Sequence, residues 1–180
     1  MSAVVWHVTM SLDGFITGPD DAMEWAFAVS GPSAMADEVM NSTGAIVAGR
    51  RWFDVATSRY SGVAGIYGGA WTGPVFVLTH RPAEIQDDPT VTVCADGIAN
   101  AVAAARRAAG DKNVEIFGAN TAHQSLDAGL LDEIAVHIAP VMLGDGVRFY
   151  GGPDAATVAL ERTELAASGP MTDLRFAVVR

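Results

Sequence analysis

The sequence predicts an α/β fold with a mostly parallel central sheet and antiparallel strands at the C-terminus. Short runs rich in Val, Ile and Leu alternate with segments of helical spacing as far as residue 128, and beyond it only strand-like runs follow. Strands that alternate with helices form parallel sheets, whereas successive strands joined by a tight turn pair as antiparallel hairpins. Since the chain has 180 residues and no composition break, we expect one domain over 1–180.

The first predicted strand is the apolar run 4–10, which we expect at the centre of the sheet. The segment Ser11-Leu12-Asp13-Gly14 closes it in a turn, because Asp supplies a side-chain hydrogen bond and Gly a permissive φ. A helix is predicted over 33–40 from its apolar spacing. A second buried strand, 44–49, is followed directly by a helix that opens at Arg50.

The second half of the chain continues the alternation. The glycine-rich stretch 60–73 predicts a long surface loop of the kind that serves as a lid or binding loop. Thr121 and Gln124 have the spacing of a capping box at a helix start. The later elements are predicted as strands at 74–79 and 91–94, a helix at 98–109, a strand at 114–117, a helix to about 128, a long strand at 130–143, and a hairpin of 158–167 with 174–179.

Composition narrows the classes of partner. The chain has 11 basic and 21 acidic residues, a net charge of −10, which argues against nucleic acid and anionic membrane as partners. Its apolar stretches are interrupted well short of a membrane span, and the N-terminus lacks the order of a signal peptide. A single cysteine, Cys94, cannot form an internal disulfide. We therefore expect a cytoplasmic protein whose partner is a small molecule.

Two strand-to-helix junctions predict an anion site. Gly49-Arg50-Arg51 and the turn 118–121 would both lie at the carboxyl ends of strands, where free backbone N–H groups face a ligand with several phosphates. Thr79 and Arg81 follow a third strand. Taken singly, each junction is explained better by ordinary turn chemistry, and the arginines by solvated or loop charge; the joint arrangement of the junctions with Thr79 and Arg81 favours the anion site. The chain carries no G-x-G-x-x-G and no P-loop motif.

Metal ligation is not predicted. The four histidines are scattered, and Cys94 has no partner at ligand spacing. His123 and His137 are interpreted as structural residues of a helix and a strand. His7 shares a strand face with Thr9, so it is either a hydrogen-bonded core residue or part of a pocket.

Several stretches together resemble one known family. Residues 10–16, 49–51, 77–81, 118–121, 126–134 and 140–146 closely resemble the bacterial riboflavin-biosynthesis reductase C-terminal domain family, a branch of the dihydrofolate reductase-like fold. The resemblance covers nearly the whole chain in order. It implies a three-layer α/β sandwich and NADPH-dependent (NADP) hydride transfer to a small heterocyclic or carbonyl substrate.

The resemblance also implies site residues. Arg50 and Thr79 would hold the 2′-phosphate, and Arg51 with the turn 118–121 the pyrophosphate. The full cofactor set is Ile16, Gly49, Arg50, Arg51, Leu78, Thr79, Arg81, Gly118, Ala119, Asn120 and Thr121. Thr9 and Trp25 would border the substrate.

Two residues are candidates for the catalytic proton transfer. His7 comes first, because histidine is the side chain that ordinarily titrates nearest neutrality. Asp13 comes second, because burial can raise the pKa of a carboxyl group.

Some positions depart from the family pattern. Trp52 stands where relatives often have a phosphate-binding Thr, and the predicted helix 33–40 lacks the carboxylate that dihydrofolate reductases carry near its start. Reduction of dihydrofolate is therefore expected to be slow or absent. The alternatives are a non-catalytic nucleotide-binding protein and a reductase that uses a flavin or deazaflavin. A homodimer is expected from the apolar run 134–143, interpreted as a sheet edge that must be covered.

Overall fold

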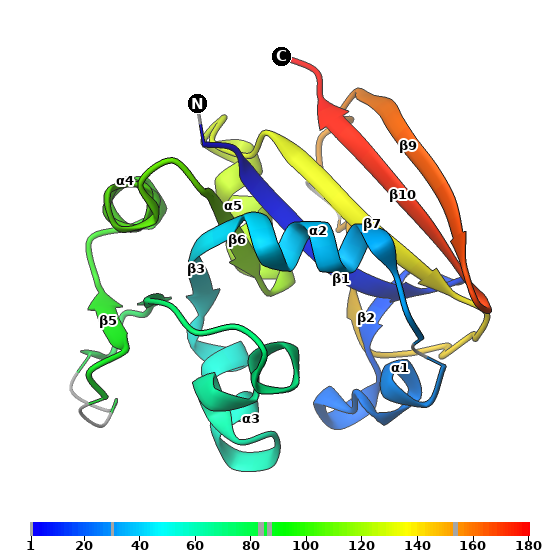
Figure 1. The fold of residues 1–180 in the computed structure, drawn as a ribbon, viewed down its shortest axis with the longest axis horizontal. Helices are drawn as coiled ribbons and strands as arrows, with labels where there is room; N and C mark the ends of the chain where they lie inside the picture. Colours follow the sequence, from blue (N-terminus) through cyan, green and yellow to red (C-terminus); the bar gives the residue numbers. More distant parts are fainter. Residues whose placement is uncertain (1, 30, 83–84, 86–87, 153–154) are drawn as a thin grey trace.

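The computed structural model describes residues 2–29, 31–82, 85, 88–152 and 155–180. Within these residues one sheet has the strand order β5-β4-β3-β6-β1-β7-β10-β9 (Figure 1). Its strands are β1 (Val4–Ser11), β3 (Thr43–Gly49), β4 (Val75–Leu78), β5 (Val91–Cys94), β6 (Asn113–Phe117), β7 (Glu133–Ala139), β9 (Leu160–Ser168) and β10 (Met171–Val178). The short strands β2 (Phe15–Thr17) and β8 (Val147–Arg148) pair separately.

The sheet is parallel from β5 to β7 and antiparallel at its C-terminal end. β1 lies between β6 and β7 and is parallel to both. β10 runs antiparallel to β7, and β9 runs antiparallel to β10. This confirms the predicted parallel sheet with antiparallel C-terminal strands, and it confirms the central position of the first strand.

Helices cover both faces of the sheet, which makes three layers. The helices are α1 (Glu24–Val29), α2 (Ala34–Ser42), α3 (Arg50–Arg59), α4 (Ile98–Ala109) and α5 (Ala119–Asp127), with the 3₁₀ segments η1 (Pro19–Asp21) and η2 (Gly62–Gly69). α4 and α5 pack on one face and α2 and η2 on the other. In the described part of the chain, no helix has the length and apolar character needed to cross a membrane.

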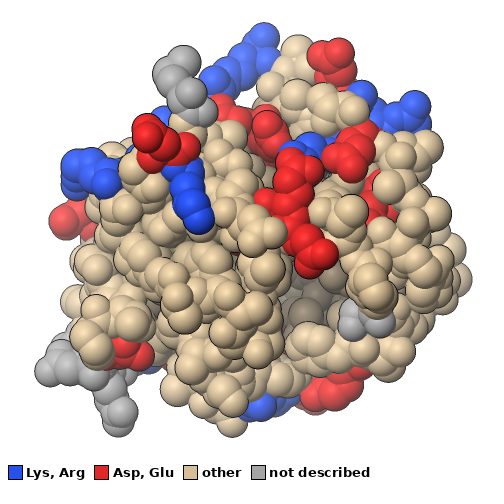
Figure 2. Space-filling model, viewed as in Figure 1, with Lys and Arg blue, Asp and Glu red and all other residues tan. Residues whose placement is uncertain are grey.

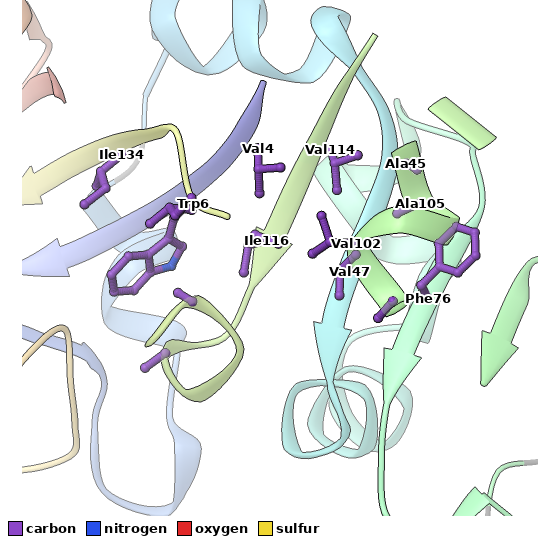
Figure 3. Packing of buried hydrophobic residues seen from close by; sticks show 14 of the residues in the cluster. Val4, Trp6, Ala45, Val47, Phe76, Val102, Ala105, Val114, Ile116 and Ile134 are labelled. Carbon is purple, nitrogen blue, oxygen red and sulfur yellow. The ribbon is translucent and has the colours of Figure 1, made fainter. Parts of the chain in front are cut away.

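Strand alternation decides which side chains meet which helix layer. Val4 and Trp6 of β1 point toward α4 and α5, together with Val114 and Ile116 of β6 (Figure 3). Trp6 is 1% exposed, and removing about 200 Å² of such a side chain from water contributes at most about 5 kcal/mol. The residues between them in sequence face α2 and η2 instead. That second face is the one that carries His7.

The predicted strand 130–143 is shorter in the structure. β7 ends at Ala139, because Pro140 has no N–H to donate and the N–H of Val141 bonds back to the carbonyl of Ala139 at 2.8 Å. β7 also lies inside the sheet, between β1 and β10. The apolar run 134–143 is therefore not an exposed edge, and the reason given for a homodimer was wrong.

The capping-box prediction was also wrong. α5 begins after Gly118, which has a φ of 92° and makes no side-chain cap hydrogen bond. Thr121 lies inside the helix and is buried, while the Gln124 side chain donates to Asn120 Oδ1 at 2.6 Å. A glycine with a positive φ, rather than a hydroxyl, sets this helix start.

The stretch 60–73 is only partly a surface loop. Ile66 and Trp71 are buried against β3 and β4, and the Trp71 indole N–H donates to the carbonyl of Thr43 at 3.1 Å. The glycines permit tight 3₁₀ turns between these inward-pointing aromatic and aliphatic residues. The segment is therefore part of the core as well as a cover for the sheet.

The carboxyl ends of the parallel strands form the edge from which α3 and α5 start. Figure 2 shows that the molecular face on this side is hollowed below a group of acidic side chains, between the regions that Figure 1 assigns to α3 and α1. Open α/β sheets bind their ligands at this edge.

Candidate functional site

The two predicted strand-to-helix junctions touch each other. Gly49 ends β3 and Gly118 follows β6, and these strands are neighbours in the sheet. A Cβ atom on Gly49 would lie 2.7 Å from Thr121 Oγ1, so only glycine fits without displacement. Neither helix start has a side-chain cap, which leaves the first N–H groups of α3 and α5 without a capping side chain. Leu78, the register partner of Gly49, ends the next strand along.

The structure brings Arg50, Thr79 and Arg81 together beside these junctions. The Arg50 guanidinium donates from Nη1 to the carbonyl of Arg81 at 3.2 Å and from Nε to Asp54 Oδ1 at 2.7 Å. The Arg81 N–H donates to Thr79 Oγ1 at 3.0 Å. A positively charged group next to uncapped helix starts is the arrangement that the anion-site prediction requires.

The Arg51 side chain pairs with η1 and not with the group formed by Arg50, Thr79 and Arg81. It is 70% exposed, and its Nε lies 2.9 Å from Oδ1 of Asp21. Trp52, the next residue, packs edge-on against Phe117 at the end of β6, with ring centroids 5.0 Å apart. In this structure, Asp21 rather than the turn 118–121 is the partner of Arg51.

A row of polar side chains crosses the sheet on the α2 face. Glu115, His7, His137 and Asp173 come from β6, β1, β7 and β10, which are consecutive strands of the sheet. His7 Nε2 lies 2.6 Å from His137 Nε2, and His137 Nδ1 lies 2.6 Å from Asp173 Oδ1. Glu115 and Asp173 are both fully buried. The described residues hold no group of three or more His, Cys, Asp or Glu side chains placed to bind a metal ion.

The Glu115 end of the row is closed by two hydroxyl groups. Tyr67 of η2 donates to Glu115 Oε1 at 2.7 Å, and Thr43 donates to Oε2 at 3.0 Å. The Tyr67 oxygen also lies 2.6 Å from His7 Nδ1, which is itself 3.1 Å from Glu115 Oε1. Burial and the neighbouring Glu115 carboxylate raise the pKa of Tyr67 far above its ordinary value, so the phenol keeps its proton.

The Asp173 end supplies a carboxylate at the start of α2. Ser33, the N-cap of that helix, donates to Asp173 Oδ2 at 2.6 Å, and Ser168 donates to the same oxygen. Burial alone would raise the pKa of Asp173, but the hydrogen bonds from Ser168, Ser33 and His137 outweigh it and lower the pKa. The carboxylate that the sequence lacks near this helix therefore comes from β10.

His137 is a buried base whose two neighbours, His7 and Asp173, shift its pKa in opposite directions. Desolvation lowers its pKa, and the charge of the adjacent His7 lowers it further, while the hydrogen bond with Asp173 acts in the opposite direction. The net pKa of His137 is below its ordinary value. A second ring proton on His137 is therefore opposed while His7 carries a charge.

Asp13 serves as an anchor at the carboxyl end of β1. Its carboxylate accepts from Ser11 Oγ at 2.6 Å and from the N–H groups of Leu143 and Gly144 at 3.0 and 2.7 Å. The bond from Ser11, with those backbone donors, lowers the pKa of Asp13 to about 2. The direction is opposite to the rise considered for a proton donor.

The remaining predicted residues divide between edge and core. Thr9 is half-buried and is the register partner of His137, one step beyond His7 on the same face. The Trp25 indole donates to the carbonyl of Ala22 at 3.1 Å, within its own segment. Ile16 is buried in the cluster on the α4 and α5 face.

Sequence reasoning missed Glu115, Tyr67, His137 and Asp173 as site residues. Glu115 had a signal, since a carboxylate in the otherwise apolar strand Val-Glu-Ile-Phe must find buried partners. Tyr67 and Asp173 had none, because their partners are 48 and 36 residues away along the chain.

Comparison with protein families gives a match over nearly the whole chain. The family described as the RibD C-terminal domain matches residues 2–172. No curated protein matches the sequence.

Solved structures share the fold at low identity. A candidate riboflavin biosynthesis protein from Shewanella sp. PV-4 has a TM-score of 0.78 and 22% identity, with 100% of each chain covered. A pyrimidine reductase-like protein from Corynebacterium diphtheriae has a TM-score of 0.67 and 16% identity, with 99% of this chain and 92% of that chain covered. A diaminohydroxyphosphoribosylaminopyrimidine deaminase/5-amino-6-(5-phosphoribosylamino)uracil reductase from Thermotoga maritima has a TM-score of 0.69 and 15% identity, and the match covers 99% of this chain but 57% of that one.

Proposed function

The chain belongs to the RibD C-terminal domain family, and from this premise we propose that it is an NADPH-dependent reductase of a small heterocyclic or carbonyl compound. The family supports a reductase role. The cofactor and the kind of substrate are our inference from the carboxyl edge of the sheet.

The observation that carries the proposal is the meeting of the two helix starts with the arginine group. The glycine at position 49 leaves a cradle that a Cβ atom would fill, and the first turns of α3 and α5 open beside it. Arg50, the residue after Gly49, is held against the carbonyl of Arg81, whose N–H donates to Thr79 Oγ1. These features fit a dinucleotide whose pyrophosphate lies at the helix starts and whose 2′-phosphate lies at Arg50 and Thr79.

When bound, NADPH would supply the hydride. The protein must then hold the acceptor at the carboxyl end of β1 and provide one proton to the atom that receives the displaced electron pair. Thr9 borders this position, and the His7–His137 pair lies directly behind it. Asp13 holds the turn that closes the site, through its bonds to Leu143 and Gly144.

Calorimetric titration with NADPH and NADH tests the cofactor half of the proposal. A charge-assisted hydrogen bond contributes about 1.5–3 kcal/mol, so we expect NADPH to bind about 10- to 100-fold more tightly than NADH. Arg50→Ala should remove most of this preference. Arg107→Ala, which removes an exposed arginine of α4, is the matched control and should keep it.

Other outcomes would redirect the assignment. Equal affinities for the two dinucleotides in the parent protein would overturn NADPH selectivity. Binding of a flavin but of neither dinucleotide would favour the flavin or deazaflavin alternative. NADPH binding without oxidation across a panel of pyrimidines, pteridines and carbonyl compounds would favour a nucleotide-binding protein.

A further inference from the structure

We propose that the row Glu115–Tyr67–His7–His137–Asp173 stores one transferable proton beside the substrate position and gives it to the substrate as the hydride is added. This inference rests on the proposed reductase function and identifies where its proton is held. The row is formed by side chains from four consecutive strands of the sheet and from η2.

The hydrogen-bond roles at the Asp173 end are fixed. Asp173 accepts from both Ser33 and Ser168, so its remaining oxygen also acts as an acceptor. His137 Nδ1, 2.6 Å from that oxygen, must therefore carry a proton and donate it. His137 Nε2 then points toward His7.

In one arrangement of the protons, the Glu115 end gives His7 the same role. Because the Tyr67 hydroxyl donates to Glu115, its oxygen is available as an acceptor for His7 Nδ1 at 2.6 Å. With both Nδ1 atoms protonated, the two Nε2 atoms face each other at 2.6 Å. Two lone pairs cannot face each other at that distance, so in this arrangement a third proton lies between the rings.

The same protons have a second arrangement. Glu115 can carry one and donate it to the Tyr67 oxygen, while Tyr67 donates to His7 Nδ1 and His7 Nε2 donates to His137 Nε2. Both arrangements contain the same number of protons and the same short contacts. Shifting protons along the hydrogen bonds therefore moves the excess proton between Glu115 and the imidazole pair without moving heavy atoms.

The surroundings favour one excess proton and oppose two. Burial and the charge of His7 lower the pKa of His137, so His7 and His137 do not each carry a second ring proton at the same time. α2 packs Met35 and Val39 against this face, and these side chains carry no charge. The one basic residue of β10, Arg175, forms ion pairs with glutamates 38, 133 and 164.

The pair lies where an acceptor can reach it. The His7 and His137 side chains keep 9% and 6% of their surface exposed, and His137 is level with half-buried Thr9. Hydride adds to the carbon of a C=N or C=O bond, and the π electron pair moves to nitrogen or oxygen. This nitrogen or oxygen atom takes the shared proton when it occupies the place of one Nε2 as that proton's hydrogen-bond partner. Solvent then returns a proton to the row.

Nitrogen-15 NMR of histidine-labelled protein tests the stored proton without any cofactor. At pH 7 we expect His7 and His137 to show protonated Nδ1 and a shared proton at Nε2, and to change together on titration. His80→Asn, at an exposed position, helps the assignment and should leave these signals unchanged. Independent titration of the two rings, each with one neutral tautomer at pH 7, would overturn the proposal.

Asp173→Asn tests delivery of the proton. The variant should lower kcat by at least tenfold and keep the Kd for NADPH within twofold, because Asp173 acts through His137 and not on the cofactor. It should also release the His137 tautomer in the NMR spectrum. An unchanged kcat would refute delivery, whereas a parent protein that does not bind or oxidise NADPH would refute the proposed function and leave the NMR result to decide on the stored proton.

Discussion

Gly49→Ala is a precise test of how the two helix starts meet. Gly49 has a φ of −79°, which any residue adopts, so the effect of alanine comes from the new methyl group alone. That methyl would lie 2.7 Å from Thr121 Oγ1, and Thr121 is 1% exposed and held inside α5. Overpacking a close contact costs about 1–3 kcal/mol, and the lower entropy of unfolded alanine offsets about 0.5 kcal/mol of it.

The expected net loss is about 0.5–2.5 kcal/mol in the free energy of unfolding. For a domain of this size each kcal/mol lowers Tm by about 2–4 °C, so thermal unfolding should occur about 1–10 °C lower. Gly18→Ala is the matched control, because its Cβ would meet Ala22 at an ordinary 3.6 Å. If NADPH binds at this junction, Gly49→Ala should also weaken it, since the methyl separates the two sets of N–H groups.

A double-mutant cycle with Thr121→Ala isolates the contact. Removing the hydroxyl should recover part of the loss, with a coupling of about 1–2 kcal/mol between the two positions. Additive effects, or a Gly49→Ala protein as stable as the parent, would show that the helix starts do not touch as described.

Three further predictions concern other parts of the molecule. The pKa of Asp13 is about 2 in the folded state and 3.8 in the reference state, so the unfolded chain binds more protons between these values and stability falls as pH drops from about 4 to 2. Asp13→Asn should flatten this loss in urea unfolding at each pH, whereas Asp127→Asn at an exposed position should retain it. Trp71→Phe leaves the carbonyl of Thr43 without its indole donor and should lower the free energy of unfolding, measured by chemical denaturation, by about 1–3 kcal/mol. A loss below about 0.5 kcal/mol would be inconsistent with the hydrogen bond. We also propose a homodimer that forms through the edge strand β9, where Leu165 is 57% exposed. Light scattering should give a dimer mass for the parent protein and a monomer mass for Leu165→Glu. A monomeric parent protein at micromolar concentration would contradict this prediction.

The sequence by itself determined most of the local elements and their kind, although the strand predicted at 130–143 ends at Ala139 and the loop predicted at 60–73 contains η2. The helix 98–109 was predicted with the boundaries that α4 has in the structure, because apolar spacing and a terminating glycine are both short-range signals. The strand-to-helix junctions at Gly49 and Gly118 were also predicted, since each is read within a few residues. Strand alternation then placed His7 and Thr9 on one face of β1.

Only the tertiary structure decided which polar groups meet. The order of strands in the sheet is a long-range property, and it sets Glu115, His7, His137 and Asp173 side by side. Nothing near Ser33 in sequence shows that a carboxylate from β10 would occupy the start of α2. A buried charge is stable only where several hydrogen-bond donors contact it. Here these donors are far apart in the sequence, and they come together only after the strands have paired.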